Sequence, residues 1–118
     1  MLFSEEKAIY IQIAEYVMDK ILKDEWISDS KILSVRDLTA ELEVNPNTVM
    51  RAYDNLQQQE IIYNKRGLGF FVNLDAKSKI QTQRKSQFLE VELPSFFNSM
   101  DLLSISIEDI VKHYQTRK

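Results

Sequence analysis

A short polar segment at the start of one predicted helix contains the residue types that read base edges in DNA. Asn47 and Thr48 fall in its first turn, and Arg51 lies one turn beyond Asn47 on the same side. Short polar groups and the bidentate guanidinium of arginine can reach neighbouring base pairs in the major groove or flanking phosphates. These residues therefore predict a reading face for double-stranded DNA.

The helix that positions these side chains is predicted from its own N-terminal signals. Asn45 suits the N-cap because its side-chain oxygen can accept from a first-turn amide, and Pro46 suits the first helical position, which needs no amide hydrogen. A stripe at three- and four-residue spacing predicts the buried side, and it consists of Val49, Ala52, Tyr53 and Leu56. The polar residues then face away from the core, with Asn45 beside them.

A shorter helix directly upstream completes a helix-turn-helix. Ser34 opens it, Asp37 approximates a capping box, and only residues 43–45 separate it from the next helix. Arg36 falls in its first turn, where a cation opposes the helix dipole unless an anion is nearby. Arg36 could pair with an acidic neighbour on the surface, but we favour a contact with a phosphate or a base.

Two short β-favouring runs after the helix-turn-helix predict a hairpin over residues 61–63 and 70–72. The loop between them holds both glycines of the chain, and its tip carries Lys65, Arg66 and Gly67. Glycine permits positive φ and a close approach of the backbone to a partner, while the two cations can bind phosphate. A hairpin in this place is the wing of a winged helix, and we favour this interpretation over a purely structural hairpin.

The composition changes after residue 74. A polar stretch over residues 76–87 precedes a run of large apolar residues around Pro94, which should kink or end a long helix near Glu92. Two amphipathic helices this rich in apolar residues cannot bury them alone, so we expect a dimerisation arm, the alternative being that they fold back onto the core. The residues expected at the homodimer interface are Phe88, Leu89, Phe96, Phe97, Met100, Leu103, Ile107 and Ile110.

The sequence thus predicts a mainly α protein with a small β-hairpin. A winged helix-turn-helix, which starts with an amphipathic helix over residues 8–24, should occupy residues 1–74, and a two-helix dimerisation arm should occupy residues 75–118.

Composition excludes several other classes of function. The chain has no cysteine and a single histidine, His113, so thiolate catalysis, cysteine-rich zinc sites and a histidine-centred triad are hard to assemble. We therefore expect that the protein is not an enzyme and that it binds no cofactor or metal ion. No secretory signal or apolar run of membrane-spanning length is visible, so we expect a cytoplasmic protein without membrane contact.

The segment ILSVRDLTAELEVNPNTVMRAYDNL, followed by IIY and RGLGFFV, resembles the DNA-binding domain of GntR-type bacterial transcription regulators. The form VNPNTVxRAY and the short tail resemble the YtrA-type subfamily in particular. The resemblance implies a dimer that binds an inverted-repeat operator, usually as a repressor, in a subfamily that often controls genes for ABC-type transporters. It leaves any small-molecule effector unspecified. It carries roles over to Arg36, Asn45, Asn47, Thr48, Arg51, Arg66 and Gly67.

The chain departs from the family pattern at a few positions. Glu43 and Glu60 stand where glycines are usual, in the inter-helix turn and after the recognition helix, and Phe70 replaces the usual threonine of the wing. The usual Leu-Pro-Ser before the arginine is residues 32–34 here, Ile-Leu-Ser. Each glutamate replaces a residue that tolerates the left-handed conformation, so the two could shift the positions at which the helices end. Phe70 could change the backbone path in the wing.

A different class of function has to be weighed against DNA binding. The net charge of −3 would suit a winged helix that serves as a protein-interaction or scaffolding module, because DNA binding rests largely on neutralising phosphates. Such a module has no need for base-reading residues on one helix together with a basic wing. We therefore favour a sequence-specific DNA-binding regulator.

Overall fold

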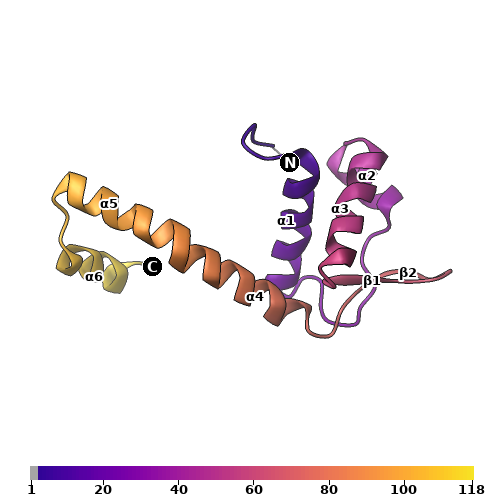
Figure 1. Cartoon of the computed structure of the whole chain (residues 1–118). Helices are drawn as coiled ribbons and strands as arrows, with labels where there is room; N and C mark the ends of the chain where they lie inside the picture. Colours follow the sequence, from indigo (N-terminus) through magenta and orange to yellow (C-terminus); the bar gives the residue numbers. More distant parts are fainter. Residues whose placement is uncertain (1–2) are drawn as a thin grey trace. The chain divides into compact units, whose positions relative to one another are not determined.

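The computed structural model describes residues 3–118, which form two compact units, one ending at Gln81 and the other spanning Thr82–Lys118. The predicted fold class is confirmed: three helices and a β-hairpin are followed by C-terminal helices (Figure 1).

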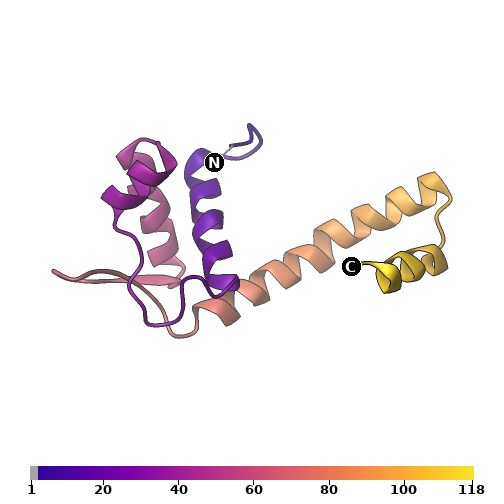
Figure 2. The ribbon, with the colours of Figure 1, turned by 180° about the vertical axis from the view of Figure 1, so that it is seen from behind.

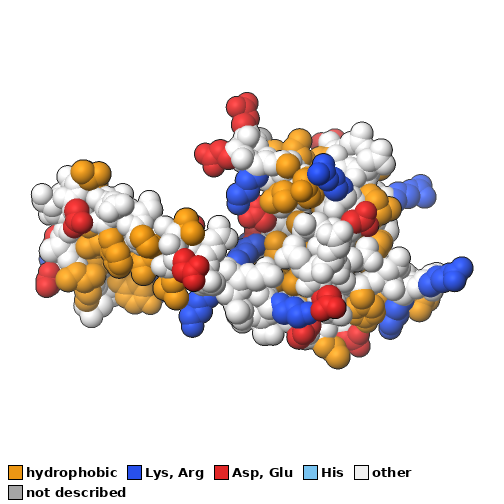
Figure 3. Space-filling view, viewed as in Figure 1, with side chains coloured by type: hydrophobic (Ala, Val, Ile, Leu, Met, Phe, Trp, Pro, Cys, Tyr) orange, Lys and Arg blue, Asp and Glu red, His pale blue; other side chains and the backbone are white. Residues whose placement is uncertain are grey.

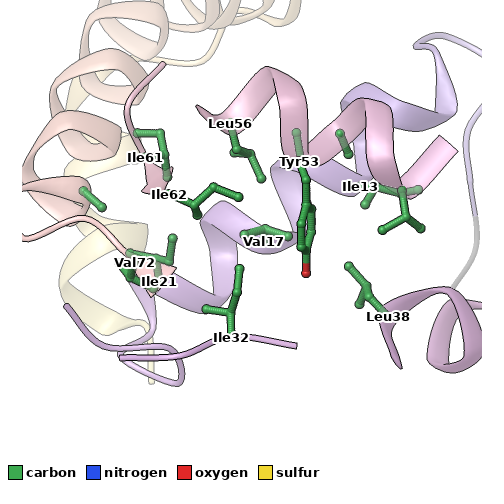
Figure 4. Close-up of a cluster of buried hydrophobic side chains, with 14 of the residues drawn as sticks. Ile13, Val17, Ile21, Ile32, Leu38, Tyr53, Leu56, Ile61, Ile62 and Val72 are labelled. Atoms are coloured by element: carbon green, nitrogen blue, oxygen red, sulfur yellow. The ribbon is translucent and has the colours of Figure 1, made fainter. Parts of the chain in front are cut away.

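The first unit is built around three helices, α1 (Ile9–Leu22), α2 (Val35–Leu42) and α3 (Pro46–Gln58). Helix α3 packs against both of the others. Figures 1 and 2 show α1 and α3 side by side with their N-termini at the same end. The stripe predicted for α3 is fully buried, in a core that also takes side chains from α1, α2 and the hairpin (Figure 4).

Tyr53 ties the centre of α3 to two other segments. Its hydroxyl donates a hydrogen bond to the carbonyl oxygen of Leu33, at 2.6 Å, and its ring meets Phe70 edge to face with centroids 4.9 Å apart. Burial raises the pKa of this hydroxyl, so it stays protonated and keeps donating. Phe70 therefore anchors the wing to α3 at the position where the family usually has threonine.

The wing consists of strands β1 (Ile62–Lys65) and β2 (Gly69–Val72), which pair antiparallel from Ile62–Val72 to Lys65–Gly69. The segment before α2 lies along the other edge of β2. The amide of Ile32 donates to the carbonyl of Phe70 at 2.9 Å, and the amide of Val72 donates to the carbonyl of Ser30 at 3.0 Å. These bonds fix the base of the wing to the core and leave its tip to project.

The two glutamates that stand where the family pattern usually has glycine adopt the left-handed conformation. The φ angles are 54° at Glu43 and 59° at Glu60, so α2 still ends at Leu42 and α3 still ends at Gln58. A side chain in this conformation costs roughly 1–2 kcal/mol, because its Cβ crowds the following carbonyl oxygen. The helix ends of the family pattern are therefore retained at the expense of local strain.

Helix α4 (Ala76–Gln87) starts inside the first unit. Ala76 and Ile80 are completely buried in the core of that unit, and Lys77 forms an ion pair with Asp24 at 2.9 Å. The first compact unit consequently extends beyond Leu74, the end that we expected from the sequence.

The second unit contains a π-helical turn, Phe88–Glu92, followed by α5 (Leu93–Leu103) and α6 (Ile107–Thr116). Pro94 lacks an amide hydrogen and its ring would clash with the carbonyl four residues earlier, and the wider π turn directly before it avoids that conflict. The change of geometry falls at the predicted place, although the chain stays helical across it. Ser106 and Asp109 form a capping box that starts α6.

Candidate nucleic-acid interface

The N-terminus of α3 presents the predicted reading residues. The side-chain oxygen of Asn45 accepts a hydrogen bond from the amide of Asn47 at 2.8 Å, which confirms the cap and leaves the Asn45 side-chain NH₂ as a donor. Asn47 and Arg51 are exposed and Thr48 is half-buried, whereas Val49 beside them is fully buried. The helix thus separates a polar outer face from an apolar inner face within one turn.

The four polar residues line one shallow hollow together with the start of α1. Its volume is about 380 Å³, and it is bordered by Ala8, Ile9, Tyr10, Asn45, Asn47, Thr48 and Arg51. The geometry brings together the residues expected to read bases, and it adds the first turn of α1, which the sequence did not assign to this site.

Arg51 is in contact with Tyr10 across this hollow. The guanidinium carbon lies 3.9 Å from the centroid of the tyrosine ring, which is the geometry of a cation–π contact. In the sequence, Tyr10 lies off the apolar stripe of the first helix, a position compatible with a solvated side chain, a phosphate contact or an inter-helix contact. In the structure its ring makes an inter-helix contact, with Arg51 of α3.

Arg36 occupies the first turn of α2, where its side chain is exposed. Ser34 caps this helix by accepting from the amide of Asp37 at 3.0 Å. No ion pair of Arg36 with Asp37 is present in the part of the chain that the structure describes, so the surface pairing weighed for Arg36 is not formed. Its charge remains available to an anion.

The wing carries its cations in two different environments. The ammonium group of Lys65 lies 4.6 Å from the centroid of the Phe71 ring, so this lysine is folded back along the strand pair. Arg66 and Gly67 are exposed at the tip, and Gly67 has a φ of +80° with open space where a Cβ would lie. The arginine is therefore the cation that projects freely from the wing.

A further cation beside the wing was missed in the sequence. Lys31 forms an isolated β-bridge with Phe71, and its Cε lies 3.0 Å from where a Cβ on Gly69 would be. Gly69 has a φ of +114°, so a larger residue would be both strained and crowded there. Lys31 comes from the segment before α2, and only a long-range strand pairing brings it to the wing, so no local pattern could have indicated it.

The residues predicted for dimerisation lie in the second unit and differ in exposure. Met100 is buried within the unit, with 9% of its surface exposed, and Ile110 is half-buried. The exposed ones are Phe88, Leu89, Phe96, Phe97, Leu103 and Ile107.

Residues 3–118 contain no cluster of three or more histidine, aspartate or glutamate side chains that could hold a metal ion. None of the helices in the described part is both long enough and apolar enough to cross a membrane.

Comparison with known proteins identifies relatives that extend over nearly the whole chain. One is a transcriptional regulator of Bacillus subtilis, YhcF, described as an uncharacterized HTH-type protein, which is 29% identical over 97% of this chain and 93% of its own length. The HTH-type transcriptional repressor YtrA of the same organism is 31% identical over 80% of this chain and 75% of its own length.

Solved structures agree with these sequence relatives. A GntR family transcriptional regulator from Listeria monocytogenes superposes with a TM-score of 0.79 at 34% identity, covering 98% of this chain and all of that one. The DNA-binding domain of AraR, solved in complex with operator ORR3, superposes with a TM-score of 0.54 at 29% identity, covering 61% of this chain and 88% of that one.

The family model of the bacterial regulatory proteins of the gntR family matches residues 9–72, which contain α1, the helix-turn-helix and the wing. This segment includes every residue that lines the hollow at α3 except Ala8. The chain therefore belongs to the GntR family: it is a DNA-binding transcription regulator with a winged helix-turn-helix, and not an enzyme.

Proposed function

We propose that the protein acts in the cytoplasm as a homodimeric repressor that binds an inverted-repeat operator. The observation that best supports a dimer is the exposed apolar surface of the second unit. Of sixteen exposed large apolar side chains among the described residues, eleven lie within Thr82–Lys118. Figure 3 shows hydrophobic side chains gathered on the visible face of this unit. A surface of this kind on a small protein marks an interface.

The exposed side chains are distributed along the helices of the second unit in a way that suits pairing with another helix. Phe96 and Phe97 on α5 are 44% and 46% exposed, and Val111 on α6 is 45% exposed, although all three are of types that proteins usually bury. A second copy of the same unit offers the same apolar helices, and self-complementary pairing of identical surfaces is the commonest route to a dimer.

In this proposal each protomer of the dimer reads one half of the operator. Asn47, Thr48 and Arg51 contact base edges in the major groove, while Asn45 and Arg36 contact the flanking backbone. The wing adds Lys65, Arg66 and the backbone at Gly67, which contact phosphates or the minor groove. Support comes from the exposure of these residues, apart from the half-buried Thr48, and from the AraR domain, whose structure contains an operator. Repression is supported by the likeness to YtrA, a repressor.

Introducing charged residues on the apolar surface tests whether the protein dimerises through it. Phe96→Asp/Phe97→Asp should sediment as a monomer and should bind operator DNA more weakly than the native chain, because the two half-sites are no longer bound together. A matched control, Ser95→Asp/Asn98→Asp, adds the same charges at exposed polar positions of α5 and should remain a dimer.

The operator for this test is first obtained by selecting random DNA with the native protein. A double variant that remains dimeric at micromolar concentration, with unchanged helical circular dichroism, would show that α5 is not the interface. If the native chain selects no common DNA sequence, that result would instead contradict the proposal that the protein binds a specific operator.

A further inference from the structure

Tyr10 offers a fixed aromatic surface at the edge of the DNA-reading hollow. The residue lies in the first turn of α1, where it is half-buried and packs against the hydrophobic core. Its ring is therefore held by the interior of the first unit, while its outer face meets the exposed side chain of Arg51 at 3.9 Å. The long side chain of Arg51 is thus in contact with an aromatic ring that packs on the core.

This contact restricts the long Arg51 side chain without using up its hydrogen-bonding capacity. A guanidinium stacks through its flat face, and its five N–H donors point outward in the plane of the group. The edge that recognises a guanine or a phosphate therefore remains free. An unsupported arginine on a helix surface would sample many rotamers and would lose that freedom on binding.

The hollow places this arginine beside the other polar residues at the start of α3. Asn45, Asn47 and Thr48 border the same hollow as Tyr10 and Arg51. Helices α1 and α3 also pack directly on each other, so the distance between the ring and the backbone of Arg51 is set by the core. A guanidinium restrained in this hollow would face the same stretch of DNA as its polar neighbours.

We propose that Tyr10 is a positioning residue for sequence reading: it holds the guanidinium of Arg51 ready before DNA arrives, and so sharpens the preference for one base pair in each half-site. The inference rests on the proposed contact between Arg51 and the operator. The ring face performs this role and the hydroxyl does not, so phenylalanine should replace tyrosine and an aliphatic residue should not.

The test measures affinities of four variants for the selected operator and for its single-base-pair variants, at one salt concentration. Tyr10→Leu should weaken operator binding about two- to five-fold for each half-site, the equivalent of an exposed cation–π contact. It should also lose preference at the same base-pair position as Arg51→Ala. Tyr10→Phe should bind like the native chain, and Tyr10→Leu/Arg51→Ala should bind no more weakly than Arg51→Ala.

A matched control uses the second tyrosine of α1 that stacks with a cation. Tyr16 is half-buried against the core, and Lys20 lies 5.3 Å from its ring centroid, away from the reading hollow. Tyr16→Leu should leave the base-pair preference unchanged. Thermal melting of all variants separates positioning from general destabilisation.

Three results would overturn the inference while leaving the operator contact of Arg51 in place. Tyr10→Leu could keep native preference, Tyr10→Phe could weaken binding as much as Tyr10→Leu, or the effects of the two single substitutions could add in the double variant. An Arg51→Ala variant with native preference would instead show that Arg51 does not read the operator at all.

Discussion

Ile80 should be essential for the stability of the DNA-binding unit, although it lies beyond the hairpin in a polar stretch of sequence. Its side chain is completely buried in the core of the first unit. Replacement by alanine removes three carbon atoms, which corresponds to about 2.4 kcal/mol of transfer free energy at roughly 0.8 kcal/mol per group, plus a cavity contribution. We therefore expect Ile80→Ala to lower the free energy of unfolding of this unit by about 3–4 kcal/mol.

Urea denaturation followed by tryptophan fluorescence reports on this unit selectively, because Trp26 is the single tryptophan of the chain and packs against the same core. The midpoint should shift to lower urea with an unchanged slope. Gln81→Ala, at the adjacent exposed position, should change the free energy by less than about 0.5 kcal/mol. If Ile80→Ala behaves like Gln81→Ala, the start of α4 does not belong to the core.

Two further perturbations test the helix end at Glu43 and the wing. Glu43→Gly should raise the free energy of unfolding by about 1 kcal/mol relative to Glu43→Ala in the same urea assay, because both remove the carboxylate but only glycine relieves a φ of 54°; equal stability of the two variants would show that this residue is unstrained. Arg66→Ala should make the plot of log affinity for the operator against log salt shallower by about 0.9 for each phosphate that the wing no longer neutralises. As a control, Lys23→Ala removes an exposed cation at the C-terminal end of α1, the end away from the reading hollow, and should not change that slope. If Arg66→Ala also leaves the slope unchanged, the wing tip does not contact phosphate.

The features that the sequence predicted best are those with local causes. The start of α3 follows from an asparagine cap beside Pro46, and the position of the wing follows from two β-favouring runs around the glycines. The helix ends at Glu43 and Glu60 could not be decided from the sequence. A left-handed residue other than glycine is tolerated only because the surrounding packing compensates for its strain, and that packing involves the whole unit.

The features that the sequence missed or left open depend on long-range packing. The contact between Tyr10 and Arg51 requires α1 and α3 to be aligned, and the position of Lys31 beside the wing requires a third segment to pair with β2. Ile80 did carry a signal, as the lone large apolar residue of a polar stretch, but the partner that buries it is a core formed by distant segments. Met100 matched the apolar pattern expected of an interface and is nevertheless buried within its own unit.

Base reading by the polar start of α3 can be measured through Arg51. The affinities of the native chain and of Arg51→Ala are compared over every single-base-pair variant of the selected operator at one salt concentration. We predict that Arg51→Ala costs about 1–3 kcal/mol per half-site and relaxes the preference at one base-pair position in each half. A uniform loss across all operator variants would contradict base reading by Arg51, and no loss at all would contradict the placement of this helix in the groove.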